Sequence, residues 1–388
     1  MKQKISKLFQ EKFKTDKIPQ VYFAPGRVNI IGEHIDYNGG HVLPFAINLG
    51  TYAAATLRDD DIINFLSVNF EEQISVKISE LDYNQAHKWA NYPKGVLKLI
   101  IDAKFHIDKG FDVLFWGNLP TGAGLSSSAS IELVTAVMIS DLFKYGITQL
   151  DKVKISQMAE NNYMGVKCGI MDQFAIGMGK KDYAILLNTS TLNYEYIPLI
   201  LENHSIIVVN SMKKRELVDS EFNTRQNECK TGLKLLQKEL IINNLCEIDY
   251  VTFLRNKHLI EDEIIQKRVK HVITENERTI SLAEALKNNN LFDIKTPMCK
   301  SHESLRDNYQ VTGFELDVLV DIINKQDGVL AGRMTGAGFG GCAIAIVQNK
   351  FVTNFISNVK EEYKKITNLE AEFYNVKSED GARKILND

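Results

Sequence analysis

The chain is poor in cysteine, and the few cysteines form no pattern. They stand at positions 168, 229, 246, 299 and 342 of 388 residues, without a CxxC pair or a zinc-type spacing. An odd, scattered set argues against a disulfide framework and against a structural zinc site. We therefore expect a reduced, cytoplasmic protein whose cysteines mainly fill the core.

Long apolar runs and an excess of charge are missing as well. The longest runs, such as Cys342–Val347, are far shorter than the roughly 18 residues of a membrane helix. The apolar residues of Met1–Lys17 have helical spacing with lysines between them, unlike the core of a signal peptide. With 46 basic and 49 acidic residues, the formal net charge of -3 excludes a strongly basic nucleic-acid binder and an acidic disordered chain.

No internal repeat or low-complexity linker is present, and the length predicts two domains. Strands are expected at 21–23, 42–47, 52–57, 65–68, 74–78, 111–116, 184–187, 205–210 and 342–347. Helices are expected at 93–105, 127–143, 150–162, 221–239, 267–287, 298–308, 314–324 and 351–367. Strands and helices mix without a βαβ rhythm, which predicts an α+β fold. The polar stretch 189–203 suggests a boundary, giving domains 1–195 and 196–388.

Glycine is present in ordinary amount but is unevenly placed. Twelve of the 24 glycines fall within residues 25–44, 117–130 and 331–347. Glycine allows backbone angles and close approaches that a Cβ atom forbids. These three stretches are therefore the first candidates for functional loops.

The first stretch places four chemically active side chains around glycine turns: Arg27, Glu33, His34 and Asp36. Carboxylates accept hydrogen bonds from hydroxyl groups, so the set suits a polyhydroxylated ligand. A metal site is an alternative without a recognised ligand spacing. A solvated loop is another, disfavoured by the long apolar residues between the charges.

The second stretch, Gly117–Ser130, lies between an expected strand and an expected helix. A glycine loop that leads into a helix N-terminus forms an anion site, because free N–H groups and the positive end of the helix dipole face the ligand. The spacing matches neither a Walker A loop nor a dinucleotide fingerprint. A serine here can ligate Mg²⁺ beside phosphates, although the serines could also simply cap the helix.

The third stretch contains a GxGxxG match at Gly336, Gly338 and Gly341. That motif must open a helix, whereas the alternation in Cys342–Val347 predicts a strand. A nicotinamide cofactor is therefore not indicated. A loop that approaches the ligand fits better than a plain hairpin turn, which needs fewer glycines.

Together the stretches resemble the galactokinases, within the superfamily of sugar, mevalonate and homoserine kinases (GHMP kinases). Further similar segments follow in the same order: Ser67–Phe70, Trp89–Gly95, Ala159–Asn161, Cys168–Phe174 and Ser301–Asp307. The resemblance covers nearly the whole chain. It implies a GHMP-kinase-like fold, with an N-terminal mixed α/β domain, a C-terminal ferredoxin-like α+β domain and the active site between them.

The resemblance also implies an activity, namely phosphorylation of the anomeric C1 hydroxyl of D-galactose. ATP would be the co-substrate and Mg²⁺ the cofactor, and galactose 1-phosphate would enter the Leloir pathway of galactose utilisation. A kinase for N-acetylgalactosamine or another sugar is an alternative, as is a non-catalytic regulator that senses galactose and ATP. We expect no nucleic-acid or membrane partner and a monomer, or at most a weak homodimer.

The resemblance assigns roles to individual residues. Asp172 matches the catalytic aspartate that accepts the sugar proton, and Arg27 matches the arginine beside it, which would stabilise the anion and the developing phosphoryl charge. The expected sugar-binding residues are Glu33, His34, Asp36, Gly169, Asp172 and Phe222. The family usually has a tyrosine at the position of Phe222, and losing its hydrogen bond would cost about 0.5–1.5 kcal/mol.

Nucleotide and metal contacts are implied in the same way. The expected nucleotide-binding residues are Ser67, Trp89, Gly122, Ala123, Gly124, Leu125, Ser126, Ser127 and Ser128. Ser128 and Glu160 match the Mg²⁺ ligands. For Trp89 a purely structural place in the core is the alternative.

Overall fold

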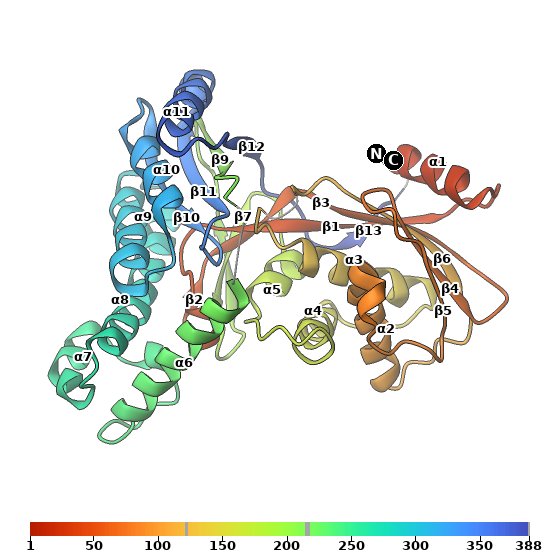
Figure 1. The fold of residues 1–388 in the computed structure, drawn as a ribbon, viewed down its shortest axis with the longest axis horizontal. Coiled ribbons are helices and arrows are strands. Elements are labelled where there is room, and N and C mark those ends of the chain that lie inside the picture. The colour runs from red at the N-terminus through yellow and green to blue at the C-terminus, as the bar shows by residue number, and fades with distance from the viewer. Residues whose placement is uncertain (121–122, 214–217, 387–388) are drawn as a thin grey trace.

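The computed structural model describes residues 1–120, 123–213 and 218–386, except for the side chains of residues 218–220. The chain builds two sheets with their own helices, joined by a smaller sheet (Figure 1). Among the described residues, no helix is both long and apolar enough to cross a membrane.

The first sheet has six strands in the order β13-β1-β3-β6-β4-β5. Its neighbours run antiparallel except for the parallel pair of β4 and β6. The strands are β1 (Gln20–Asn29), β3 (Pro44–Leu57), β4 (Ile62–Ser67), β5 (Ile74–Lys77), β6 (Phe111–Gly117) and β13 (Arg383–Lys384).

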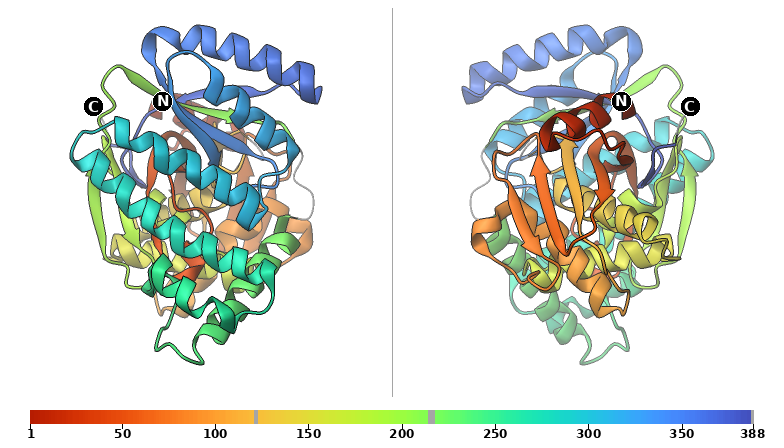
Figure 2. Two further views of the ribbon diagram at one scale, coloured as in Figure 1. Left: turned by 90° about the vertical axis from the view of Figure 1, so that its left-hand side faces the viewer. Right: turned by 90° about the vertical axis from the view of Figure 1, so that its right-hand side faces the viewer.

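Both faces of this sheet are covered (Figure 1). One face carries α2 (Asn91–Asp102), α3 (Ser127–Leu142), α4 (Gln149–Met158) and α5 (Met171–Met178). The other carries α1 (Lys2–Phe13), whose Ile5 and Phe9 pack against strand residues such as Leu114. Figure 2 shows α1 lying across the strands in its right-hand view.

The second sheet is antiparallel, with the order β10-β11-β9-β12. Its strands are β9 (His204–Asn210), β10 (Val329–Thr335), β11 (Cys342–Gln348) and β12 (Glu372–Val376). Numbered along the chain, this is the 4-1-3-2 order of a ferredoxin-like sheet. The predicted α+β fold with a ferredoxin-like second half is confirmed.

Helices α10 (Phe314–Lys325) and α11 (Val352–Thr367) cover one face of the second sheet. The opposite face packs on α8 (Glu263–Lys287) and α9 (Phe292–Ser304), and also on Ile30, Leu43 and Phe45 of the first half. One apolar core therefore crosses from the first half of the chain into the second. Two further helices, α6 (Val218–Leu236) and α7 (Tyr250–Asn256), lie at the periphery.

The smaller sheet contains β2 (His41–Val42), β7 (Tyr183–Asn188) and β8 (Tyr194–Pro198) in the order β2-β7-β8. The predicted division between residues 195 and 196 falls inside β8 and stays a prediction. Residues near the C-terminus return to the first sheet, where β13 pairs with β1 at Tyr22 and Phe23.

Candidate active site

A polar cavity of about 110 Å³ lies where the two halves meet. Its lining comes from β1 and the segment after it, from residues 168–172, from α6 and from the loop after β10. Every predicted catalytic and sugar-binding residue lines it: Arg27, Glu33, His34, Asp36, Gly169, Asp172 and Phe222. The first and third glycine stretches therefore meet at one place, which we name the sugar cavity.

Arg27 and Asp172 form a two-pronged ion pair in this cavity. Arg27 Nε lies 2.7 Å from Asp172 Oδ1, and Nη2 lies 2.9 Å from Oδ2. Arg27 comes from β1 and is 6% exposed, while Asp172 stands in the first turn of α5. The remaining Nη1 donates to the carbonyl oxygen of Gly124 at 2.6 Å. The guanidinium thus joins the carboxylate to the second glycine stretch.

Ser126 has a role that capping does not describe. It occupies the N-cap of α3 with a left-handed φ of 61°, yet its side chain makes no cap hydrogen bond. Its hydroxyl instead donates to Asp172 Oδ2 at 2.5 Å. Of the two alternatives for this residue, helix capping is therefore excluded, and the hydroxyl is an additional partner of the Asp172 carboxylate.

Asp36 lies beside Gly169 in the sugar cavity. A Cβ atom on Gly169 would come within 1.8 Å of Asp36 Oδ2, so no other residue fits here without moving the carboxylate. Burial, and next the negative charge of Asp172, raise the pKa of Asp36 to about 7. Asp36 lines the cavity, where its carboxylate can accept hydrogen bonds from hydroxyl groups.

Glu33 is held firmly by the second half of the chain. Its Oε2 lies 2.5 Å from Arg333 Nη2, and both side chains are almost fully buried. Its Oε1 accepts from Thr335 Oγ1 at 3.3 Å and from Gly336 N at 3.2 Å. Burial raises the pKa of Glu33, and Arg333 opposes this effect. The carboxylate therefore has a fixed orientation toward the cavity.

His34 has both ring nitrogens occupied by protein groups. Burial lowers its pKa to about 3, so the ring is neutral. Nε2 lies 3.0 Å from the carbonyl oxygen of Ala337 and must donate to it, so Nδ1 accepts from the Tyr37 hydroxyl at 2.8 Å. Tyr37 in turn contacts the Tyr309 hydroxyl at 2.9 Å. A hydroxyl contact by His34 stays a prediction, and this geometry offers a sugar the ring face.

Phe222 adds the aromatic side of the cavity. Its ring centroid lies 5.6 Å from that of His34 and 5.0 Å from that of Tyr37, the latter edge to face. It projects from α6, in the second half of the chain. The rings of His34 and Phe222 therefore form an aromatic part of the cavity wall.

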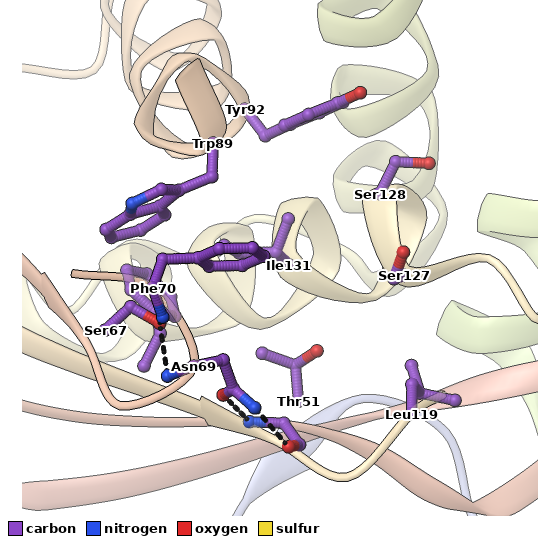
Figure 3. Close-up of a pocket in the computed structure, with 12 residues that line it drawn as sticks. Thr51, Ser67, Asn69, Phe70, Trp89, Tyr92, Leu119, Ser127, Ser128 and Ile131 are labelled. Atoms are coloured by element: carbon purple, nitrogen blue, oxygen red, sulfur yellow. Dashed lines mark hydrogen bonds between the residues drawn. The ribbon is translucent and has the colours of Figure 1, made fainter. Parts of the chain in front are cut away.

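A second cavity, of about 170 Å³, lies near the start of α3 (Figure 3). Four of the predicted nucleotide-site residues line it: Ser67, Trp89, Ser127 and Ser128. Trp89 is 8% exposed, and its indole nitrogen finds no hydrogen-bond partner among the described residues. The ring also packs on Phe115, which supports its place in the core, and the nucleotide contact of Trp89 stays a prediction. We name this space the base cavity.

The second glycine stretch separates the two cavities. Ala123 and Leu125 are buried, and Gly124 receives the Arg27 hydrogen bond. Helix α3 begins at Ser127, so its first N–H groups open toward this loop. The predicted nucleotide contact Gly122 lies outside the described residues.

Glu160 belongs to a buried acidic group behind this loop. It stands in a short π-helix, Ala159–Tyr163, a form that often occurs at functional sites. Gln173 Nε2 donates to Glu160 Oε2 at 2.5 Å and to Glu132 Oε2 at 3.3 Å, and the Ser128 hydroxyl is a further partner of Glu160. Burial, and next Asp172, raise the pKa of Glu160. Among the described residues, no three His, Cys, Asp or Glu side chains gather closely enough to hold a metal alone.

Sequence patterns missed three features of these cavities. They did not identify Gln173 as the partner of Glu160, Arg333 as the partner of Glu33, or Ser126 as the partner of Asp172. The only available signal was position, because each lies inside or beside a motif already singled out. The pairings themselves depend on contacts between distant segments.

Comparison with known proteins gives the class first. Residues 91–180 match the family described as GHMP kinases N terminal domain, and residues 282–365 match GHMP kinases C terminal. The crystal structure of Methanococcus jannaschii mevalonate kinase shares the fold, with a TM-score of 0.66 and 20% identity over 94% of this chain and 100% of that chain. The fold and the paired cavities therefore define a GHMP kinase.

Residues 7–57 match the galactokinase galactose-binding signature. The galactokinase of Fusobacterium nucleatum is 50% identical over 99% of this chain and 100% of that protein. The chain belongs to the galactokinase family. The galactokinase of Enterococcus faecalis is 48% identical over 94% and 95% of the two chains. The crystal structure of Lactococcus lactis galactokinase complexed with galactose is 41% identical, with a TM-score of 0.96 over 99% of each chain.

Proposed function

We propose that the protein transfers the γ-phosphoryl group of ATP to the anomeric C1 hydroxyl of D-galactose. The observation that carries the proposal is the Arg27–Asp172 pair, which stands in the sugar cavity and touches the glycine loop through Gly124. The carboxylate that would act on the sugar and the arginine that would act on the phosphoryl group are thus in direct contact, beside the glycine loop. The product, galactose 1-phosphate, is the first committed intermediate of galactose utilisation.

Galactose would be held by groups of opposite character. Asp36 and Glu33 accept hydrogen bonds from sugar hydroxyls, and Gly169 leaves the space that this requires. The rings of Phe222 and His34 pack on the apolar face of the sugar. Because Glu33 is fixed from β10, the sugar contacts groups that both halves of the chain position.

ATP would occupy the base cavity and the glycine loop. Phe70 and Trp89 offer nearly parallel rings, with 17° between their planes, for the base. The N–H groups at the start of α3 receive the phosphates. Phosphoryl transfer depends mainly on positioning and charge neutralisation, and this arrangement supplies both.

Mg²⁺ fits the group around Glu160. This carboxylate is 8% exposed, and the described residues place no cationic side chain within ion-pair distance of it. Mg²⁺ usually takes one or two carboxylates together with substrate phosphates rather than a full protein cage. Glu160 and the hydroxyl of Ser128 would hold it, and the bound ion would neutralise charge on the phosphates.

Asp172 would accept the proton of the sugar hydroxyl. Two hydrogen bonds from Arg27 and a third from Ser126 hold both oxygens of its carboxylate in place. In a loose transition state the bond from the sugar oxygen to phosphorus is only partly formed. The hydroxyl therefore becomes acidic late in the reaction, and Asp172 would receive the proton at that stage.

We also propose a cytoplasmic location. Among the described residues no two cysteines form a disulfide, which suits a reducing compartment. We also propose a monomer, or at most a weak homodimer. Size-exclusion chromatography with light scattering over a range of concentrations would show the mass directly.

A sugar panel tests the proposed reaction. ADP release would be followed with galactose, N-acetylgalactosamine and glucose, with and without Mg²⁺. Galactose-dependent, Mg²⁺-requiring turnover is expected. Preference for N-acetylgalactosamine would favour the related sugar kinase, and binding of galactose and ATP without turnover would favour a sensing regulator.

Asp172→Asn tests the assigned base. The substitution keeps the shape of the side chain and removes the proton acceptor, so kcat should fall by about 10²–10⁴-fold. Galactose affinity, measured by calorimetry, should stay within a few-fold of the parent value. Ser126→Ala, which removes one partner of the same carboxylate, should lower kcat much less. Turnover of Asp172→Asn within tenfold of the parent would exclude Asp172 as the base.

A further inference from the structure

Asn69 joins the wall of the base cavity to the start of the glycine loop (Figure 3). Its Oδ1 accepts from the backbone N–H of Gly117 at 2.8 Å, and its Nδ2 donates to the carbonyl oxygen of Gly117 at 2.9 Å. Gly117 is the last residue of β6, where the chain leaves the sheet toward the glycine loop. The amide of Asn69 therefore bonds both the N–H and the carbonyl group of Gly117, the residue that we call the root of the glycine loop.

The residues around Asn69 form the cavity wall. Strand β4 ends at Ser67, whose hydroxyl oxygen accepts from the backbone N–H groups of Asn69 at 3.1 Å and Phe70 at 3.3 Å. The Phe70 ring then faces Trp89, with 6.2 Å between the centroids. A base bound in the cavity would contact this turn directly, so base binding and the orientation of Asn69 are linked.

A second asparagine supports the loop's root from the other side. Asn118 Oδ1 accepts from Gly50 N at 2.8 Å, and Asn118 N donates to Gly50 O at 3.1 Å. These bonds tie the root to β3 and do not reach the turn at Ser67–Phe70. Asn118 is therefore a matched comparison, since it supports the same loop without contacting the base-cavity wall.

We propose that Asn69 is a positioning residue that couples occupation of the base cavity to placement of the glycine loop under the phosphates. The inference rests on the proposed function, because it takes ATP as the ligand. When the base orders the turn, the Asn69 amide is held in place, and through its two hydrogen bonds it fixes Gly117 at the start of the glycine loop. ATP consequently binds more tightly than it would if the site for its base and the site for its phosphates were independent of each other.

The test compares Asn69→Ala with Asn118→Ala and the parent chain. Asn69 is exposed, so its removal should leave the thermal midpoint nearly unchanged. In Asn69→Ala, the Kd of ATP by calorimetry and its KM should rise about tenfold. The inhibition constants of adenosine and of magnesium tripolyphosphate should each stay within twofold, as should the Kd of galactose. In Asn118→Ala, ATP and tripolyphosphate should weaken together.

Three results would overturn the coupling. An unchanged ATP Kd in Asn69→Ala would show that the amide does not couple the base cavity to the glycine loop. A loss of adenosine affinity as large as the loss for ATP would limit Asn69 to the wall of the base cavity. A loss of tripolyphosphate affinity as large as the loss for ATP would make it a loop anchor, like Asn118. If the parent chain binds no ATP at all, the proposed function fails instead.

Discussion

Phe222 brings a ring to the sugar cavity but no hydroxyl. Adding that hydroxyl should change the affinity for galactose. In Phe222→Tyr a hydroxyl would point from the same ring toward the sugar. One added hydrogen bond contributes about 0.5–1.5 kcal/mol, so the galactose KM should fall roughly 2- to 10-fold. Steady-state kinetics at saturating ATP measure this directly. An unchanged or higher KM would show that another group already serves that part of the sugar.

The charged form of Asp36 should lower the free energy of unfolding and favour the binding of galactose. Its pKa rises from 3.8 in the unfolded chain to about 7, so between these values the folded protein holds the extra proton. Stability contributed by this group is therefore full at low pH and is lost as the pH rises toward 7. Asp36→Asn removes the buried charge, and at pH 8 it should be more stable by roughly 1–3 kcal/mol, about 1–4 °C in Tm.

The two readouts for Asp36→Asn should move in opposite directions. The gain in Tm over the parent should shrink at pH 5, where the parent carboxyl is protonated. The galactose KM should rise by at least about tenfold, because the carboxylate accepts charged hydrogen bonds. A variant with the parent's Tm at pH 8 would show that the buried charge is neutralised in a way that the structure does not contain.

Single residues could be predicted from the sequence only where a motif carried them. Arg27 and Asp172 were expected to lie together, and the structure places them 2.7 Å apart. For Ser126 the motif predicted a nucleotide contact, with a helix cap as the alternative, but not the hydrogen bond to Asp172, because that bond joins two segments distant in the sequence. Arg333 is fully buried, and a charged residue inside a strand gives no local sign of the carboxylate that pairs with it.

The short π-helix Ala159–Tyr163 is an element whose function depends on a neighbour. It presents Glu160, and Gln173 from α5 holds one oxygen of that carboxylate. Partners behind a metal ligand typically contribute 10- to 100-fold in metal affinity. In Gln173→Leu, the Mg²⁺ concentration for half-maximal rate should therefore rise about 10- to 100-fold.

Direct metal binding gives this prediction a second readout. Mn²⁺ binding to the enzyme–ADP complex, followed by calorimetry, should weaken by the same factor. Galactose affinity should not change, since Gln173 does not line the sugar cavity. Equal loss of galactose and metal affinity would indicate a general disturbance around α5.

Elements were predicted best where the pattern was regular. The helix expected at 127–143 is α3, Ser127–Leu142. The strands expected at 42–47 and 52–57 belong largely to one long strand, β3, which continues through Gly50. A Cβ atom there would lie 2.2 Å from the carbonyl oxygen of Ala24, so the glycine marks close packing on β1 rather than a break.

Some elements had no clear pattern. Strand β10 begins before the third glycine stretch and runs to Thr335, although part of it was expected to be loop. The buried Arg333 interrupts its apolar sequence, which hides the strand. Strand β13 has only two residues, and such a strand exists only through its partner β1.

At the scale of the whole molecule, the sugar cavity depends on both halves. Glu33 and His34 come from the first half, while Arg333 and Ala337 hold them from the second. The apolar core that crosses between the halves keeps these partners in register. Sequence patterns indicated where each motif lies, but the contacts that join the two halves at the sugar cavity follow only from the packing of the two sheets.

The return of the chain to the first sheet predicts a loss of stability on truncation. Residues 381, 382 and 385 donate backbone hydrogen bonds to Gly179, Ile176 and Val21, and Lys384 pairs with Asp141. Removal of residues 381–388 should lower stability by about 2 kcal/mol, or ~2–3 °C in Tm.

Activity separates this effect from a defect in the site. Because the removed residues do not line either cavity, kcat and KM at 20 °C should stay within twofold of the parent values. The thermal shift would be followed by calorimetry or circular dichroism. A truncated chain with the parent's Tm would show that β13 adds no net stability.

Strand β13 also has a consequence for how the protein is made. Its partner β1 is synthesised about 350 residues before β13. At 5–20 residues per second, this leaves one edge of β1 without its partner strand for roughly 20–70 s. An open strand edge is a template for pairing with another chain. The nascent protein is therefore exposed to wrong association at this edge until β13 has been synthesised.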